Sequence, residues 1–140
     1  MIYRGATLLH ATSEVTVPQI TVLIRKAYAG AYIAMGSKYL GTDQAFAWPS
    51  AEICTVAPET TASVIFRKEI ASAENPEEKE QQLLKEFHDK FVNPYHAAEL
   101  QHIDDVIEPK ETRPRLISTL QMLQGKKKEL PWKKHGNMPL

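Results

Sequence analysis

Apolar and polar residues follow one another in segments that predict helices and short strands in turn. Helical spacing predicts a helix over residues 2–16 that stops before Pro18. Its apolar side is formed by Ile2, Ala6, Leu9 and Ser13. Residues 20–24, ITVLI, are apolar without alternation, which is typical of a strand covered on both faces in a mostly parallel sheet.

The rest of the chain continues this alternation. Asn75-Pro76 and Asn93-Pro94 each combine a capping residue with a proline suited to the first helical position, so each is expected to start a helix. The predicted helices are 30–38, 58–72, 76–92, 95–100 and 112–124, the last closed by Gly125, and the predicted short strands are 45–48, 52–56 and 104–107.

Strands that alternate with helices predict an α/β fold in which helices pack on a parallel sheet, here of about four short strands. At 140 residues the chain fits one domain. We assign residues 1–125 to the domain and residues 126–140 to a basic carboxyl-terminal tail, with five lysines near Trp132. The tail is expected to be a solvated extension, or an arm that lies on a neighbouring subunit with Trp132 as its anchor.

Charge and cysteine content narrow the class of protein. Seventeen basic and seventeen acidic side chains cancel, so a nucleic acid or an anionic membrane would need a local patch. A single thiol, Cys54, excludes an internal disulfide and fits a reducing compartment. No apolar stretch reaches the roughly 18 residues of a membrane span, and the amino end lacks the pattern of a secretion signal. We therefore expect a cytoplasmic protein.

The segment RKAYAGAY, residues 25–32, places three small residues between two tyrosines where a helix is expected to begin. The first N–H groups of a helix have no helical acceptor and carry the positive end of its dipole. Gly30 and Ala31 could therefore offer two N–H groups to a developing oxyanion. Small residues are equally suited to tight helix packing, and the pattern alone does not separate these interpretations. The spacing of a phosphate-binding loop is absent.

Side-chain catalysis has weaker support in the sequence. No histidine pairs with another His, Cys or acid at a spacing typical of a metal site, so we expect no metal here. A G-x-S-x-G nucleophile motif is missing. Asp104 and Asp105 precede a predicted strand and are interpreted as turn residues. Cys54 lies in an apolar context and is interpreted as structural rather than nucleophilic.

Five blocks of the sequence resemble, in order and spacing, one known family. They are RKAYAGAY, AWPSAEI, FVNPYHAAE, IDDVIEPKETRPRLISTLQML and PWKKHGNMPL. They are similar to the carboxyl-terminal end of the carboxyltransferase β subunit of biotin-dependent acyl-CoA carboxylases of the propionyl-CoA carboxylase type. The resemblance covers essentially the whole chain and implies a crotonase-like, ClpP-like ββα spiral. The chain matches only the later part of the second of two such domains.

The resemblance also implies a function. Members of this family transfer carboxyl from carboxybiotin, carried by a partner protein, to the α-carbon of a short acyl-CoA such as propionyl- or acetyl-CoA. The implied oxyanion donors are Gly30 and Ala31, and the implied substrate-binding residues are Tyr28, Ala29, Tyr32 and Ile33. The implied partners are the first carboxyltransferase domain of a neighbouring subunit, the biotin carboxylase and biotin carrier subunit, and further copies in a homo-oligomer. No nucleic acid or membrane partner is implied.

Three positions depart from the family pattern. The family usually has glycine where Ala29, Ala57 and Thr60 stand, and Ala29 would be strained if its position requires positive φ. Thr60 is expected near a ligand wall. These changes bring the chain nearer the related decarboxylase α subunits of the glutaconyl- and methylmalonyl-CoA types. A non-catalytic oligomerisation piece is a second alternative. Enoyl-CoA hydratase chemistry is a third, with Glu52 and Glu59 as acids outside that family's motif.

Overall fold

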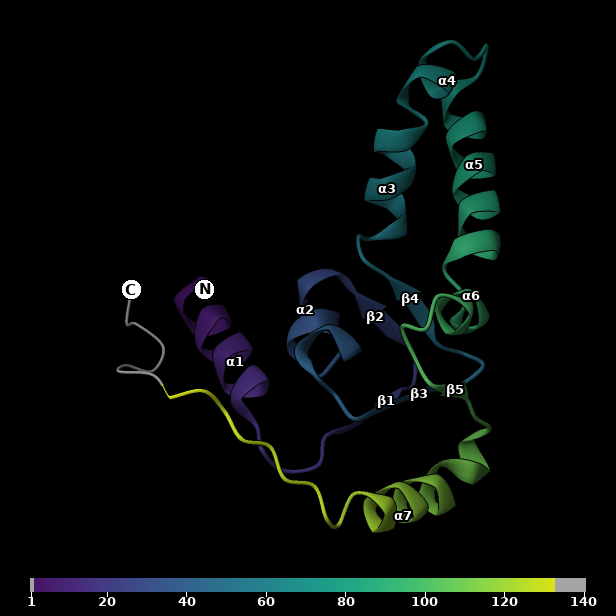
Figure 1. Cartoon of the computed structure of the whole chain (residues 1–140). Helices are drawn as coiled ribbons and strands as arrows, with labels where there is room; N and C mark the ends of the chain where they lie inside the picture. Colours follow the sequence, from purple (N-terminus) through teal and green to yellow (C-terminus); the bar gives the residue numbers. More distant parts are fainter. Residues whose placement is uncertain (1, 133–140) are drawn as a thin grey trace.

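The computed structural model describes residues 2–132, which alternate between short strands and helices (Figure 1). The strands are β1 (Ile20–Leu23), β2 (Lys26–Tyr28), β3 (Gln44–Ala47), β4 (Glu52–Cys54) and β5 (Asp105–Val106). The α-helices are α1 (Ile2–Glu14), α2 (Ala29–Ala34), α3 (Pro58–Ile65), α4 (Arg67–Ala71), α5 (Pro76–Phe91), α6 (Pro94–Glu99) and α7 (Thr112–Met122). Two 3₁₀ turns lie at Lys38–Leu40 and Pro109–Glu111.

The strands form two small parallel sheets. One sheet has the order β1-β3-β5, and the other pairs β2 with β4. In the second sheet Lys26 lies opposite Glu52 and Tyr28 lies opposite Cys54. Parallel pairing of strands joined through helices confirms the α/β class that the alternating pattern predicts.

Small side chains dominate the core where the two sheets meet α2 and α6. Buried alanines occur on β2, β3 and α6, and they are joined by Ile53, Ile103 and Tyr32. Ala47 is completely buried. Alanine adds little bulk above a strand, so helices and sheets approach closely in the part of the molecule that carries the β2–α2 turn.

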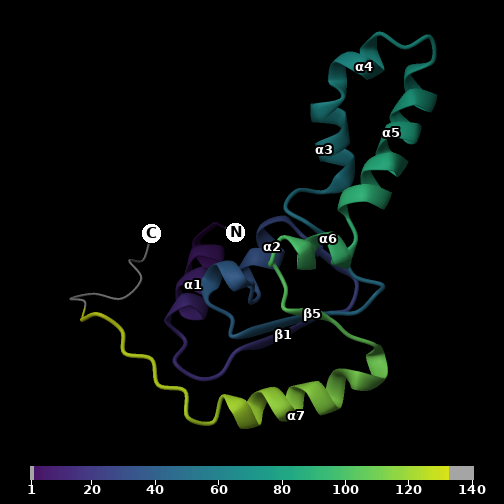
Figure 2. The ribbon, with the colours of Figure 1, turned by 45° about the vertical axis from the view of Figure 1, so that its right-hand side comes forward.

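A helical hairpin made of α3, α4 and α5 projects from this body (Figures 1 and 2). Asn75 caps α5 through its side-chain oxygen, which accepts from the N–H of Glu78 at 3.5 Å. Asn93 caps α6 in the same way and accepts from the N–H of His96 at 2.9 Å. Both helix starts are therefore confirmed by the cap geometry that the sequence predicts.

Several predicted boundaries are wrong. Strand β2 was not anticipated, so the small residues follow β2 rather than the strand over residues 20–24. The helix expected over 30–38 ends at Ala34, because Gly36 takes a left-handed φ of 112° that a helix cannot contain. The helix expected over 58–72 is divided at Phe66 into α3 and α4. The first helix ends at Glu14 and the last at Met122.

The start of the basic tail folds back on this chain. The ammonium of Lys126 lies 2.7 Å from a carboxylate oxygen of Asp43 and 3.0 Å from the carbonyl oxygen of Val17. Asp43 also accepts from the N–H of Gln19 at 2.7 Å. Trp132 is 87% exposed, so its role as an anchor on a neighbouring subunit stays a prediction. Residues 133–140 of the predicted tail lie outside the described residues.

The Asp43 contact predicts a pH-dependent stability. Burial raises the pKa of Asp43, but the Gln19 hydrogen bond and the Lys126 ammonium outweigh burial and hold this pKa below its usual value. The folded state therefore binds this proton less tightly than the unfolded chain does. Its stabilising contribution is complete above the unfolded pKa, near pH 4, and is lost as the pH falls through the lower folded pKa.

We expect Asp43→Asn to lower the free energy of unfolding at pH 7 by about 1–3 kcal/mol and to flatten the acid limb, as measured by urea unfolding between pH 2 and 7. Asp105→Asn is the matched control. Asp105 pairs with Arg115 at 2.9 Å, but both side chains are about half exposed, so the loss should stay below about 1 kcal/mol. Equal losses in the two variants would contradict the prediction.

Candidate functional site

The turn from β2 into α2 has an unusual backbone. Ala29, the first residue of α2, has a φ of 55°, in the left-handed region that side chains other than glycine rarely adopt. A Cβ in this region costs roughly 1–2 kcal/mol. The sequence predicts strain at Ala29 if this position takes a positive φ. The observed φ is positive, so Ala29 is strained.

The small residues of this turn face open space. Ala29, Gly30 and Ala31 are all exposed, and a Cβ added to Gly30 would meet no atom within 4 Å. Tyr28 occupies the cap position and its side chain accepts no hydrogen bond from the turn. The first N–H groups of a helix have no helical acceptor, so those of Gly30 and Ala31 are free to donate to an oxygen from outside the chain. Within residues 2–132, no side chain covers Gly30, and Ala29 and Ala31 stay exposed.

Beside the turn, Tyr28 is held by a charged group. Its phenol donates to a carboxylate oxygen of Glu52 on β4, and the imidazole Nε2 of His88 on α5 lies 3.7 Å from the same oxygen. The hydrogen bond from Tyr28 lowers the pKa of Glu52, with smaller contributions from Lys26 and His88. Burial and the Glu52 carboxylate raise the pKa of Tyr28. Tyr28 is therefore a protonated donor and Glu52 an ionised acceptor at neutral pH.

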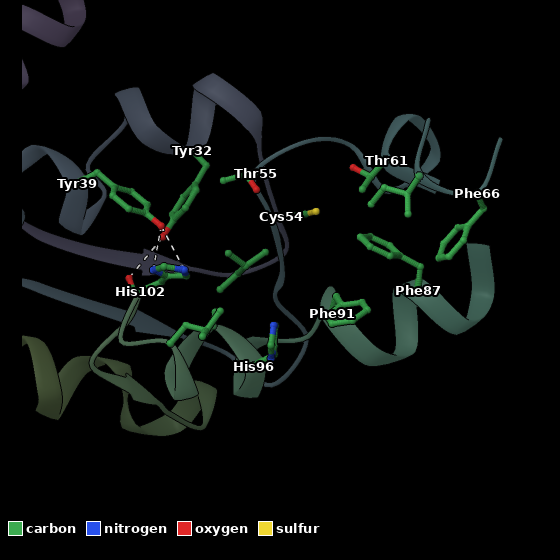
Figure 3. Close-up of a pocket in the computed structure, with 14 residues that line it drawn as sticks. Tyr32, Tyr39, Cys54, Thr55, Thr61, Phe66, Phe87, Phe91, His96 and His102 are labelled. Atoms are coloured by element: carbon green, nitrogen blue, oxygen red, sulfur yellow. Dashed lines mark hydrogen bonds between the residues drawn. The ribbon is translucent and has the colours of Figure 1, made fainter. Parts of the chain in front are cut away.

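An apolar cavity of about 540 Å³ lies between the hairpin and the body (Figure 3). Phe66, Phe87 and Phe91 line its hairpin side, and Tyr32 and Tyr39 lie on the opposite side. Its other polar groups come from Cys54, Thr55, Thr61, His96 and His102.

One end of this cavity is held by polar contacts. The phenol oxygen of Tyr39 lies 2.9 Å from Nδ1 of His102, and the phenol of Tyr32 donates to the carbonyl oxygen of His102 at 3.5 Å. Burial, followed by the nearby Tyr39, raises the pKa of Tyr32. Tyr32 is therefore neutral, and its phenol contributes a hydrogen-bonding group without charge to this wall.

The residues proposed from the sequence divide between two surfaces. Tyr32 lines the cavity, whereas Tyr28 and Ala31 line a groove of about 490 Å³ that runs along β1 and β2 and also reaches Tyr32. Ile33 is half-buried and packs against the core. Among residues 2–132, Tyr32 is the residue that lines both the cavity and the groove. Helix α2 therefore lies between them, and the exposed turn is at its start.

Other expected positions differ in detail. Thr60 is exposed and does not line the cavity, whereas its neighbour Thr61 does. Asp104 accepts from the N–H of Ala45 and pairs with Lys38 at 2.7 Å, which confirms a structural role. Cys54 lies on the cavity wall rather than in the closed core.

The contact of Glu52 with Tyr28 was missed from the sequence. The sequence suggests a role for Glu52 only as an acid in the hydratase alternative. The register of β2 against β4 could have suggested the contact, because a long side chain reaches the diagonal neighbour on the same face of a sheet. The contact joins residues 24 positions apart, and the sequence does not show the register that brings them together.

Residues 2–132 contain neither a cluster suited to a metal ion nor a helix suited to a membrane span. No group of three or more His, Cys, Asp and Glu side chains in this part of the chain could hold a metal ion. Among the same residues, no helix combines the length and the apolar character needed to cross a membrane.

Comparison with known proteins gives a consistent result over the whole chain. A sequence model of the Carboxyl transferase domain matches residues 1–138. The chain is 49% identical over 140 residues to the propionyl-CoA carboxylase carboxyltransferase subunit of Haloferax mediterranei, and 50% identical over 140 residues to the methylmalonyl-CoA decarboxylase subunit alpha of Propionigenium modestum. Both alignments cover 100% of this chain but 27% of the relative, so the chain spans about a quarter of their length.

Solved structures agree. The transcarboxylase 12S structure with methylmalonyl-coenzyme A and methylmalonic acid bound superposes with a TM-score of 0.93 at 47% identity, covering 99% of this chain and 27% of that chain. The geranyl-CoA carboxylase beta subunit of P. aeruginosa shares the fold with a TM-score of 0.72 at 17% identity, over 99% of this chain and 27% of that one. The expected crotonase-like α/β fold is confirmed.

The strain at Ala29 predicts opposite effects for two similar changes. Ala29→Gly removes a Cβ from a left-handed position and should raise the free energy of unfolding by up to about 1 kcal/mol, because relief of strain exceeds the entropy that glycine adds to the unfolded chain. Ala34→Gly, at the end of the same helix, should lower it by about 1 kcal/mol. Urea unfolding of both variants measures the difference. A loss of stability in Ala29→Gly would show that no strain is stored there.

Proposed function

Because the chain belongs to the Carboxyl transferase domain family, we propose that it forms part of a biotin-dependent acyl-CoA carboxyltransferase subunit. The reaction is transfer of carboxyl from carboxybiotin to the α-carbon of a short acyl-CoA, of the propionyl or acetyl class. The observation that carries the proposal is the open β2–α2 turn, found in a chain that aligns over its full length with carboxyltransferase relatives.

The turn fits a ligand oxygen on its own geometry. Space is empty beside Gly30, the three residues of the turn are exposed, and two N–H groups lack helical acceptors. Carboxybiotin, when bound, supplies the carboxyl group and a ureido oxygen that becomes negative as the carboxyl leaves. Gly30 and Ala31 would donate to that oxygen. One such donor is worth about 3–4 kcal/mol, or roughly 10²–10³ in rate.

The neighbouring side chains would shape the pocket around this turn. Tyr28 and Tyr32 flank it with apolar ring faces, and each carries a neutral hydroxyl. Ala29 sets the backbone direction, and its methyl is the nearest bulk to a ligand. Ile33 follows on α2 and would influence which acyl chain is accepted. This chain's own contribution would be positioning and oxyanion stabilisation rather than a side-chain base.

The proposed partners follow from the length of the relatives. The relatives' remaining sequence would supply the first carboxyltransferase domain, which we propose holds the acyl thioester oxygen from a neighbouring subunit. A biotin carboxylase and biotin carrier component would deliver the carboxylated cofactor. Homo-oligomeric assembly is supported by the transcarboxylase 12S relative, whose structure describes a hexamer.

A biotin-dependent acyl-CoA decarboxylase is a second candidate. The specific observation in its favour is the 50% identity to the Propionigenium modestum alpha subunit over the whole chain. The two candidates share the same turn and differ in the net direction of transfer. Assays of a complete subunit in both directions, from carboxybiotin to propionyl-CoA and from methylmalonyl-CoA to free biotin, would distinguish them.

Gly30→Val tests the proposal in a complete subunit, made by joining residues 1–140 to the remaining sequence of the Haloferax mediterranei relative and assembling it with its biotin-bearing partner. The valine side chain enters space that only a ligand would use, so carboxyl transfer should fall by about 100-fold or more. Stability of the chain should change by less than about 0.5 kcal/mol. Transfer of radiolabelled carboxyl to propionyl-CoA measures the effect.

Gly5→Val is the matched control for this experiment. Gly5 is also exposed and helical, and in residues 2–132 a Cβ there also meets nothing within 4 Å, but it lies on α1 rather than in the β2–α2 turn. Activity should stay near that of the unmodified subunit. Full activity in Gly30→Val would remove the turn from the reaction and leave a non-catalytic role for this segment.

A further inference from the structure

The strain at Ala29 raises the question of what holds the turn in place. A residue in a sparsely populated backbone region keeps that conformation only when its surroundings fix it on both sides. On the carboxyl side the anchor is Tyr32, which is 7% exposed and belongs to the core. On the amino side β2 ends at Tyr28, directly before the strained residue.

Tyr28 is tied to the second sheet through its side chain. Its backbone pairs with Cys54, and its phenol reaches diagonally to the carboxylate of Glu52 on the same neighbouring strand. A hydrogen bond to an ionised carboxylate is about twice as strong as one between neutral groups. Backbone and side chain of Tyr28 are therefore both held by β4.

Glu52 is itself held from the helical hairpin. Nε2 of His88 lies 3.7 Å from the oxygen that accepts from Tyr28, and the Glu52 side chain is 25% exposed. One carboxylate thus connects β2, β4 and α5 at the residue that precedes the strained turn.

We propose that Glu52 is a positioning residue: through the phenol of Tyr28 it fixes the backbone from which Gly30 and Ala31 present their N–H groups. This inference rests on the proposed function for its effect on carboxyl transfer, but its effect on the turn is independent of activity. Glu52 would touch neither biotin nor acyl-CoA. Glu52, an acid in the hydratase alternative, would here hold the backbone of the turn in place instead.

The first test uses the 140-residue chain and no substrate. Tyr28→Phe removes only the phenol hydroxyl, so the backbone amide resonances of Gly30 and Ala31 should shift as the turn loses its anchor. Tyr95→Phe is the matched control, since Tyr95 is 61% exposed and lies on α6. Two-dimensional amide NMR measures both. Identical spectra for residues 29–31 in the two variants would overturn the proposal.

The second test uses the complete subunit with its biotin-bearing partner. Glu52→Leu and Tyr28→Phe should lower kcat about 10- to 100-fold and leave KM for propionyl-CoA within about twofold, because misplaced donors weaken the transition state and not substrate binding. Glu52→Gln should restore most of kcat, since its amide oxygen still accepts from the phenol. Glu69→Leu, on the exposed α4, is the control and should change neither parameter.

A pH profile separates positioning from a general loss of structure. Glu52 faces Tyr28 and Lys26 on β2 and His88, with its neighbour Asp89, on α5. Cys54 on β4 and Glu59 on α3 act on Tyr28. The Tyr28 hydrogen bond lowers the pKa of Glu52, so kcat should decline on acidification only as the pH falls through that low pKa. The Glu52→Gln variant should lack this decline.

The outcomes separate the two proposals. If the unmodified subunit transfers no carboxyl while Tyr28→Phe still shifts the amides of Gly30 and Ala31, the proposed function fails and the positioning role stands. If the subunit is active and Glu52→Leu is as active as Glu69→Leu, the positioning role fails and the proposed function stands. A rise in KM with unchanged kcat would also overturn the positioning role, because it would place Glu52 in substrate binding.

Discussion

The left-handed backbone at Ala29 is the constraint on which the candidate site depends. A strand that passed into a helix through ordinary φ values would direct the first helical N–H groups differently, and a bulky residue would cover them. Here φ of 55° turns the chain sharply between Tyr28 and Gly30 and leaves the turn exposed. Glycine would adopt this conformation without strain, whereas alanine is strained in it. The strain persists because β2 is paired on one side and Tyr32 is buried on the other.

The alanine-rich core explains how two such short sheets can hold that turn. Strands of two to four residues contribute few hydrogen bonds, so packing must supply most of the order. Alanines on β2, β3 and α6 allow the sheets and helices to approach closely, and Ile53 and Ile103 fill the remaining space. Five aromatic side chains line the cavity beneath the hairpin instead, and two of them, Phe87 and Phe91, pack against each other with ring centroids 5.2 Å apart. The closely packed core therefore lies under the turn, and the cavity lies beside it.

The features that the sequence predicts correctly depend on residues that are close together in the chain. The two Asn-Pro pairs fixed the starts of α5 and α6, because a cap and a proline act within one turn of helix. β2 was missed because Lys26-Ala27-Tyr28 has no apolar run and becomes a strand only by pairing with residues far along the chain. The break at Phe66 carries no glycine or proline to announce it. Likewise, the small residues predicted the turn from the sequence. The Glu52 carboxylate that holds the turn was not predicted, because its contact depends on the register of β2 against β4, which no short segment encodes.

The predicted site residues lie on two surfaces, and this division affects the surroundings of the turn. Tyr28 and Ala31 face the groove along β1 and β2, and Tyr32 faces the cavity as well, so α2 lies between an apolar cavity and a groove of mixed lining, with its N–H groups at one end. A ligand oxygen at the turn would meet these donors beside both surfaces. Water excluded from such surfaces strengthens the donated hydrogen bonds, because the local dielectric falls. In the described residues β1 and β2 are each paired on one edge, so the groove lies along the unpaired edge of both strands. A group that covered this groove would exclude water from the turn. The N–H groups of Gly30 and Ala31 would then donate in a medium of lower dielectric.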